Sequence, residues 1–342
     1  MLVEGNSIRS ICRMTGTAKG TVLSLLETAG AACQKHHEET VRNIASKRIQ
    51  CNEIWGFCYS KQANIPEEHR GEPGYGDMWT WVALDADTKL AVSWMVGDRD
   101  VDTAGVFMPD VADRLTSRVQ LTTDGHKAYL EAVEGAFGMN VDYAQLVKLY
   151  GSEPESERRY SPAHCIGTET HIIQGNPDPD QICTSHIERQ NLTMRMVMHR
   201  FTRLTNGFSK KAQNLAYAVS LHFLYYNLAR PHKSLKGQTP AMAAGLADHV
   251  WDIMEMTAVI EAWGRESVKS SERNCPLPGD QLETDDARIL AYVREHGSIG
   301  IAECRAPLGV DAARAWYLLK KLRSAGRLRQ VSSKRAARYL LP

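Results

Sequence analysis

Three strand-like segments between residues 48 and 96 follow one another without a helix-forming stretch between them, and this run limits the fold more than any other feature. Residues 48–59, 78–84 and 90–96 are rich in β-branched and aromatic residues, which alternate with polar ones in the first segment. Short polar or Gly/Pro-rich stretches join them. Because strands joined without a crossover helix run antiparallel, we predict a three-stranded antiparallel meander.

The residues after the meander alternate between helical and strand-like patterns. They predict a helix over 101–115, a strand over 119–123, a helix over 129–137 and a strand over 140–149. A polar Pro/Gly-rich loop follows over 151–184, and two long helices are predicted over 185–204 and 210–228. This order of elements is that of an RNase H-like α/β fold, a mixed sheet with flanking helices.

A smaller module is predicted at each end of this core. Residues 1–35 contain two short helical patterns around a Gly-containing turn, as in a helix-turn-helix, and Thr17, Lys19 and Thr21 would then face a DNA groove. A plain helical hairpin has the same pattern. Residues 283–342 read as three helices and a basic β-hairpin, which predicts a winged helix. The core is therefore assigned to 36–264 and a linker to 265–282.

The charge of the chain is unevenly distributed. The formal net charge is +1, yet residues 305–342 hold ten Lys and Arg against Asp311 alone. A basic tail on an acidic body predicts a polyanionic partner, and a solvated basic helix face is the alternative. We expect the tail to fold apart from the core and to bind double-stranded DNA through Lys320, Lys321, Arg327, Arg329, Lys334 and Arg335.

Two carboxylates stand where an RNase H-like nuclease places metal ligands. Asp124 ends the fourth strand, and Glu188 lies at the start of the next helix but one. Such sites hold two Mg²⁺ or Mn²⁺ ions between carboxylates. For Glu188, a capping box with Ser185 is the structural alternative. The same helix and the residues after it carry arginines expected to meet DNA phosphates: Arg189, Arg195, Arg200 and Arg203.

The first strand lacks the charged residue expected at its centre. It reads Cys51-Asn52-Glu53, and strand side chains alternate, so Asn52 and Glu53 point to opposite faces. We assign the first ligand position to Asn52, which offers an amide oxygen without charge. Asp85 and Asp87 compete for that role, but their turn after the second strand should lie away from the end of the fourth.

Several segments together resemble bacterial insertion-sequence transposases of the DDE type, close to the insertion-sequence-one group. They are residues 5–16, Cys-Asn-Glu-Ile-Trp-Gly-Phe (51–57), 77–89, Thr-Thr-Asp-Gly-His-Lys-Ala-Tyr (122–129), Ile-Glu-Arg-Gln-Asn-Leu (187–192), 200–206 and 225–241. The resemblance implies metal-dependent cleavage and strand transfer at terminal inverted repeats. Relatives usually read Cys-Asp-Glu at 51–53, so the first catalytic Asp is replaced here by Asn52.

The function expected from the sequence is therefore an insertion-sequence transposase that acts on double-stranded DNA as a homodimer or larger assembly. A catalytically decayed or domesticated transposase that only binds DNA is the alternative, and Asn52 discriminates between them. A nuclease without strand transfer is a third possibility. Eight scattered cysteines without a C-x-x-C pair, and no visible signal peptide, predict a cytoplasmic protein.

Overall fold

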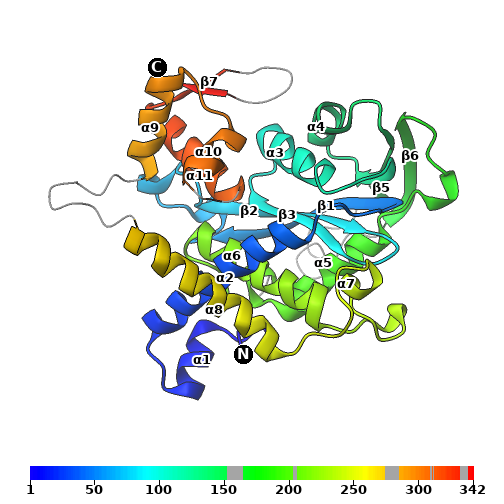
Figure 1. Ribbon diagram of the computed structural model, residues 1–342. Helices are drawn as coiled ribbons and strands as arrows, with labels where there is room; N and C mark the ends of the chain where they lie inside the picture. Colours follow the sequence, from blue (N-terminus) through cyan, green and yellow to red (C-terminus); the bar gives the residue numbers. More distant parts are fainter. Residues whose placement is uncertain (152–164, 203–205, 274–284, 309, 311, 332–337) are drawn as a thin grey trace.

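The computed structural model describes residues 1–151, 165–202, 206–273, 285–308, 310, 312–331 and 338–342. Its centre is a six-stranded mixed sheet in the order β3-β2-β1-β4-β5-β6 (Figure 1). The strands are β1 (Arg48–Cys58), β2 (Gly76–Asp85), β3 (Ala91–Gly97), β4 (Val119–Asp124), β5 (Val141–Tyr150) and β6 (Cys165–Gln174). β1, β2 and β3 form the predicted antiparallel meander, and β4 and β5 are parallel to β1.

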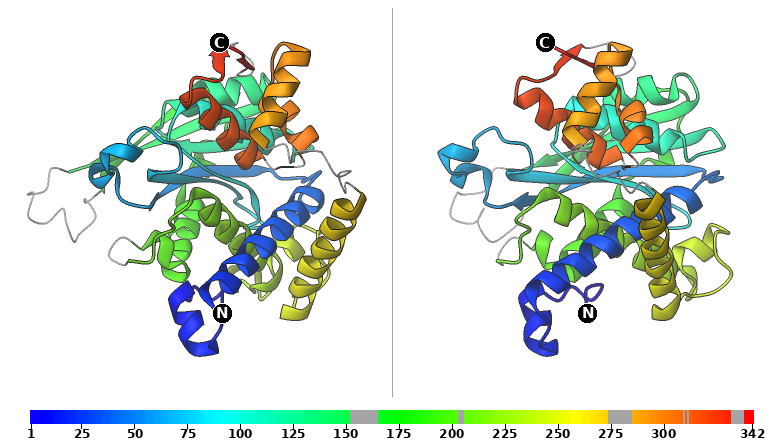
Figure 2. Two further views of the ribbon diagram at one scale, coloured as in Figure 1. Left: turned by 90° about the vertical axis from the view of Figure 1, so that its left-hand side faces the viewer. Right: turned by 60° about the vertical axis from the view of Figure 1, so that its left-hand side comes forward.

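Helices cover both faces of the sheet (Figure 2). One face carries α3 (Val101–Ala112) and α4 (Ala128–Phe137), and the other carries α2 (Lys19–Thr40), α5 (Ser185–Val197) and α6 (Ala212–Leu224). Outside these lie α1 (Ile8–Thr15), α7 (Pro240–Ala243) and α8 (Ile253–Arg273). Among the described residues, no helix combines the length and the apolar character of a membrane span.

The alternation of apolar residues along the strands divides the core into two clusters. Trp81 and Leu121 pack with Phe107 of α3 and Tyr129 of α4 on one face. Ile54 and its neighbours pack with α5 and α6 on the other. Burial on both faces explains the apolar character of the central strands, which made them predictable.

α2 is longer than the short helix predicted within residues 1–35, and it runs through Gly30. A Cβ at Gly30 would lie 2.3 Å from the Cβ of Tyr217 in α6. Glycine therefore serves here for the close crossing of two helices and not as a helix stop. α2 also crosses the boundary drawn at residue 35, so the N-terminal helices continue into the core.

Three further expectations need correction. The predicted loop over 151–184 contains β6, whose Ile and Thr residues at alternating positions were a strand signal that we missed. The helix predicted over 185–204 ends at Val197, because the extended backbone at Met198 lets Met198 and Phe201 turn into the core. α8 extends to Arg273 into the predicted linker, since no proline interrupts it.

The C-terminal residues form a small module above the sheet (Figures 1 and 2). It comprises α9 (Asp285–His296), α10 (Ile301–Leu308), α11 (Ala312–Ser324) and the antiparallel pair β7 (Arg329–Val331) and β8 (Arg338–Leu340). The module has an apolar core of its own. It does not stand apart, however, because Trp316 packs into the main core.

Candidate active site and nucleic-acid interface

Asn52 and Asp124 are neighbours on adjacent parallel strands. Cys51 of β1 pairs with Thr123 of β4, and one step further along this register Asn52 stands beside Asp124, the last residue of β4. β4 ends at Asp124, whereas β1 continues to Cys58, so Asn52 and Asp124 lie where β1 loses its neighbour on that side. Asn52 Oδ1 accepts a hydrogen bond from the backbone N–H of Glu53 at 2.7 Å.

Hydrogen bonds on both sides of Glu188 hold α5 against β1. Gln50 Oε1 accepts from the backbone N–H groups of His186 and Ile187, each at 3.0 Å. Asn191 Nδ2 donates to the carbonyl of Glu53 at 3.5 Å. Since Gln50 reaches α5, Asn52, two residues further along the strand, faces α5 as well. Glu188 is therefore held over the stretch of β1 that carries Asn52.

The capping-box alternative does not describe Glu188. The residue before the helix is Thr184, not Ser185, and its hydroxyl donates to Glu188 Oε1 at 2.5 Å. The other carboxylate oxygen, Oε2, lies 2.5 Å from Nζ of Lys148 on β5. The Glu188 carboxylate thus contacts both the residue that precedes its own helix and a strand of the sheet.

Arg99 and Lys148 are two residues of this site that the sequence gave no reason to select. Nη2 of Arg99 lies 3.2 Å from Asp124 Oδ2, and its Nε lies 3.0 Å from Glu53 Oε2. The guanidinium also stacks over the ring of Trp79. Each predicted ligand carboxylate therefore has a cationic side chain against it. Arg99 comes from the short connection between β3 and α3, and Lys148 from β5, so only the fold brings them here.

Glu53 is the most perturbed carboxyl group near the site. Its side chain is 1% exposed, and it lies on the α4 face near Tyr129, opposite to Asn52. Burial, and next the charge of Asp124, raise its pKa to about 7, although Arg99 acts in the other direction. The Tyr129 hydroxyl also acts on this carboxyl group and lowers its pKa. The protonation state of Glu53 thus affects the charge beside Asp124 near neutral pH.

The donor set suits one hard cation better than two. If Asp124, Glu188 and Asn52 converged on one ion, they would supply two carboxylates and one amide oxygen, the donors of a single Mg²⁺ or Mn²⁺ that keeps water or phosphate ligands. Two divalent ions a few ångströms apart need more negative charge than this. Within the described residues, no three His, Cys, Asp or Glu side chains gather as a metal-binding group.

Asp85 and Asp87 have structural roles at the other end of β1. Asp85 pairs with Ile49 and accepts from the backbone N–H groups of Asp87 and Thr88, which closes the turn after β2. Asp87 forms an ion pair with Arg48. Since β1 and β4 are parallel, this turn lies at the opposite edge of the sheet from Asp124, as predicted.

A basic groove lies between the N-terminal helices and the segment around residues 198–211. α1 ends at Gly16 in the left-handed conformation, Thr17 is half-buried, and Lys19 and Thr21 are exposed at the start of α2. The groove has a volume of about 770 Å³ and an apolar floor. The cations lining it are Arg9, Lys19, Arg200, Lys210 and Lys211, against one acid, Glu27.

Arg200 gives this groove the character of an anion site. Its guanidinium donates to the Ser209 hydroxyl, and burial lowers its pKa. In the described part of the chain, none of the five cations forms an ion pair with a carboxylate. A half-buried guanidinium without a counter-charge is unfavourable, and a phosphate would supply that charge. Of the other predicted arginines, Arg189 is exposed on α5, Arg195 is half-buried, and Arg203 lies outside the described residues.

Part of the positive charge of the C-terminal module is paired with acidic residues, most of them in the core. Lys320 pairs with Asp98 and Asp100, which flank Arg99, and Arg323 lies 3.2 Å from Asp102. Lys321 pairs with Asp286 of the module itself. Arg327 and Arg329 are exposed near the hairpin, while Lys334 and Arg335 lie outside the described residues. The positive charge of this tail is therefore less available than its sequence suggested.

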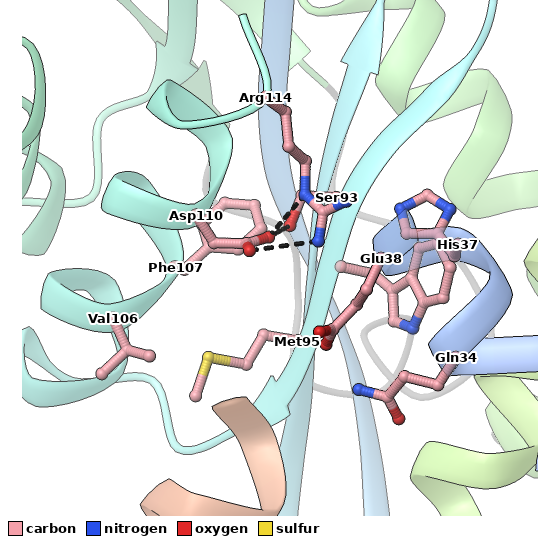
Figure 3. Close-up of a pocket in the computed structure, with 10 residues that line it drawn as sticks. Gln34, His37, Glu38, Ser93, Met95, Val106, Phe107, Asp110 and Arg114 are labelled. Atoms are coloured by element: carbon pink, nitrogen blue, oxygen red, sulfur yellow. Dashed lines mark hydrogen bonds and ion pairs between the residues drawn. The ribbon is translucent and has the colours of Figure 1, made fainter. Parts of the chain in front are cut away.

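A buried ion pair at the junction of α2, β3 and α3 has a structural role (Figure 3). Arg114 Nε lies 2.8 Å from Asp110 Oδ2, which also accepts from Ser93, and Arg114 donates to the carbonyl of Val41. His37 reaches the carbonyl of Val92 beside them. The adjoining cavity of about 20 Å³ has room for about one water molecule.

Neither protein-family models nor curated proteins match this chain. The case for its function therefore rests on its residues and their arrangement.

Proposed function

We propose that this chain is a DDE-type DNA transposase with an RNase H-like core, a helix-turn-helix formed by α1 and α2, and a C-terminal winged helix. One observation carries the proposal: α5 is fastened to β1 on both sides of Glu188, opposite the point where Asn52 adjoins Asp124. The strand order, a meander followed by parallel β4 and β5, supports the same core.

In this proposal Asp124, Glu188 and Asn52 hold Mg²⁺ or Mn²⁺, and the metal supplies the activation of water or a 3′-hydroxyl for phosphodiester chemistry. The basic groove binds the phosphates of double-stranded DNA through Lys19 and Arg200. The protein acts in the cytoplasm on the ends of its element, as a homodimer or larger assembly.

A second candidate function is DNA binding without cleavage, as in a decayed or domesticated transposase. Asn52 lacks the charge of a carboxylate, and Arg99 and Lys148 already neutralise Asp124 and Glu188. A metal ion would have to displace both cationic side chains. The cations of the basic groove lie outside this group of residues, so DNA binding would persist without cleavage.

The test compares the full chain with its Asn52→Asp variant on DNA that carries the ends of the element. Nicking is followed with and without Mg²⁺, and binding is followed in EDTA. We expect both proteins to bind, and Asn52→Asp to nick more strongly in Mg²⁺, with Asn52→Asp/Asp124→Ala as the inactive control. Binding by both without any nicking would favour the second candidate. Absence of binding would contradict both.

A further inference from the structure

β6 is an exposed edge strand that leaves large apolar side chains in solvent. It pairs with β5 on one side and is the last strand in the sheet. Ile166, Ile172 and Ile173 of this strand are 67%, 57% and 44% exposed. It has neither a lysine nor a proline, two residues that protect natural sheet edges from pairing, and it pairs regularly with β5 from Gly167 to Ile172, between register shifts at Tyr143/Ala144 and Leu149/Tyr150. Such an edge offers unpaired backbone groups to another strand.

The sequence of β6 is complementary to itself in one antiparallel register. If two copies meet with Thr170 opposite Thr170, each Glu169 lies opposite the His171 of the other copy. In the same register, Ile172 lies opposite Thr168 and diagonal to Ile166 of the other copy. Within one chain, Glu169 Oε2 already lies 3.7 Å from His171 Nε2, so both groups project from one face.

We propose that β6 pairs with β6 of a second copy of this chain about a two-fold axis at Thr170, which joins the two sheets into one continuous sheet. Glu169 and His171 select the register, because the carboxylate of each Glu169 faces the imidazole of the other copy's His171, a hydrogen-bond donor, twice across the pair. Thr168, Thr170, Ile166 and Ile172 supply β-branched contacts on the other face.

A second copy fits this edge better than nucleic acid does. β6 contains no lysine or arginine to meet phosphates, and the carboxylate of Glu169 would repel them. A single pair of strands buries less than the roughly 1,200 Å² of a stable complex. The dimer is therefore expected to depend on protein concentration. It does not require that the protein cleave or bind DNA.

Sedimentation of the full chain over a wide concentration range tests this pairing. We expect a reversible dimer in the wild type. His171→Glu places two carboxylates opposite one another, and Glu169→Lys removes the acceptor that faces His171, so each should weaken the dimer at least tenfold. The double variant Glu169→His/His171→Glu restores the carboxylate–imidazole pairs and should recover it. Unchanged thermal unfolding of each variant would show that the fold is intact.

A crosslinking experiment examines the register itself. Thr170→Cys should form a disulfide between two copies on mild oxidation, because this residue faces itself in the proposed pair. Glu131→Cys, on the exposed side of α4, is the matched control, and the wild type gives the background from its exposed Cys165. A wild type that stays monomeric at high concentration, charge variants that dimerise normally, or equal crosslinking at 170 and 131 would overturn the proposal.

Discussion

Replacing Glu53 by Gln should remove a pH dependence of stability that the buried carboxyl group creates. The pKa of Glu53 rises from 4.5 to about 7 in the folded protein, with burial as the main cause. A folded-state pKa above the unfolded one means that the native protein binds the proton more tightly. The stability gained is fully present below about pH 4.5 and is lost as the pH rises through 7.

The two pKa values determine the size of this effect. Between pH 5 and pH 8, linkage predicts that the Glu53 carboxyl lowers the free energy of unfolding by about 2.5 kcal/mol. Gln has nearly the same shape, keeps an oxygen for Arg99 and does not titrate. Between pH 5 and pH 8, the free energy of unfolding should therefore fall by about 2.5 kcal/mol less in Glu53→Gln than in the wild type.

Urea unfolding followed by tryptophan fluorescence at pH 5 and pH 8 measures both free energies for each protein. Glu131→Gln, an exposed substitution on α4, controls for the removal of one carboxylate. If the wild type and Glu53→Gln differ by less than about 0.5 kcal/mol in their response to pH, burial does not hold the proton on Glu53. Arg99 would then dominate that carboxyl group, contrary to our reasoning.

Three other outcomes follow from the packing and the charges. Gly30→Ala should destabilise the protein by about 1–3 kcal/mol in urea unfolding, because the added methyl group meets α6, whereas Gly20→Ala, in open space on the same helix, should not. Arg114→Met should cost about 3–5 kcal/mol in the same assay, since it leaves Asp110 buried without its partner. If the groove binds DNA, Lys210→Gln should reduce the slope of log affinity against log salt by about 0.9, and Lys320→Gln, already paired with acids, should leave it unchanged; equal slopes for these two variants would contradict the assignment.

The sequence alone was sufficient for the first five strands of the central sheet. Burial on both faces gives β1 to β5 a strong apolar and β-branched signal, and the absence of a helix between 48 and 96 fixed the meander. The period of two also separated Asn52 from Glu53, and the hairpin turn after the second strand placed Asp85 away from Asp124. β6 was missed because most of its side chains are exposed, which weakens the pattern by which buried strands are recognised.

The tertiary structure alone decided which charges meet. Asp124 and Glu188 could be selected from the ends of predicted elements and Asn52 from the middle of the first strand, because local pattern locates such positions. Arg99 and Lys148 could not, since the side chains that they neutralise lie on other elements, and charge pairing depends on distance in space rather than on order in the chain. For the same reason the sequence predicted a tail with free positive charge, whereas in the structure Lys320 pairs with Asp98 and Asp100.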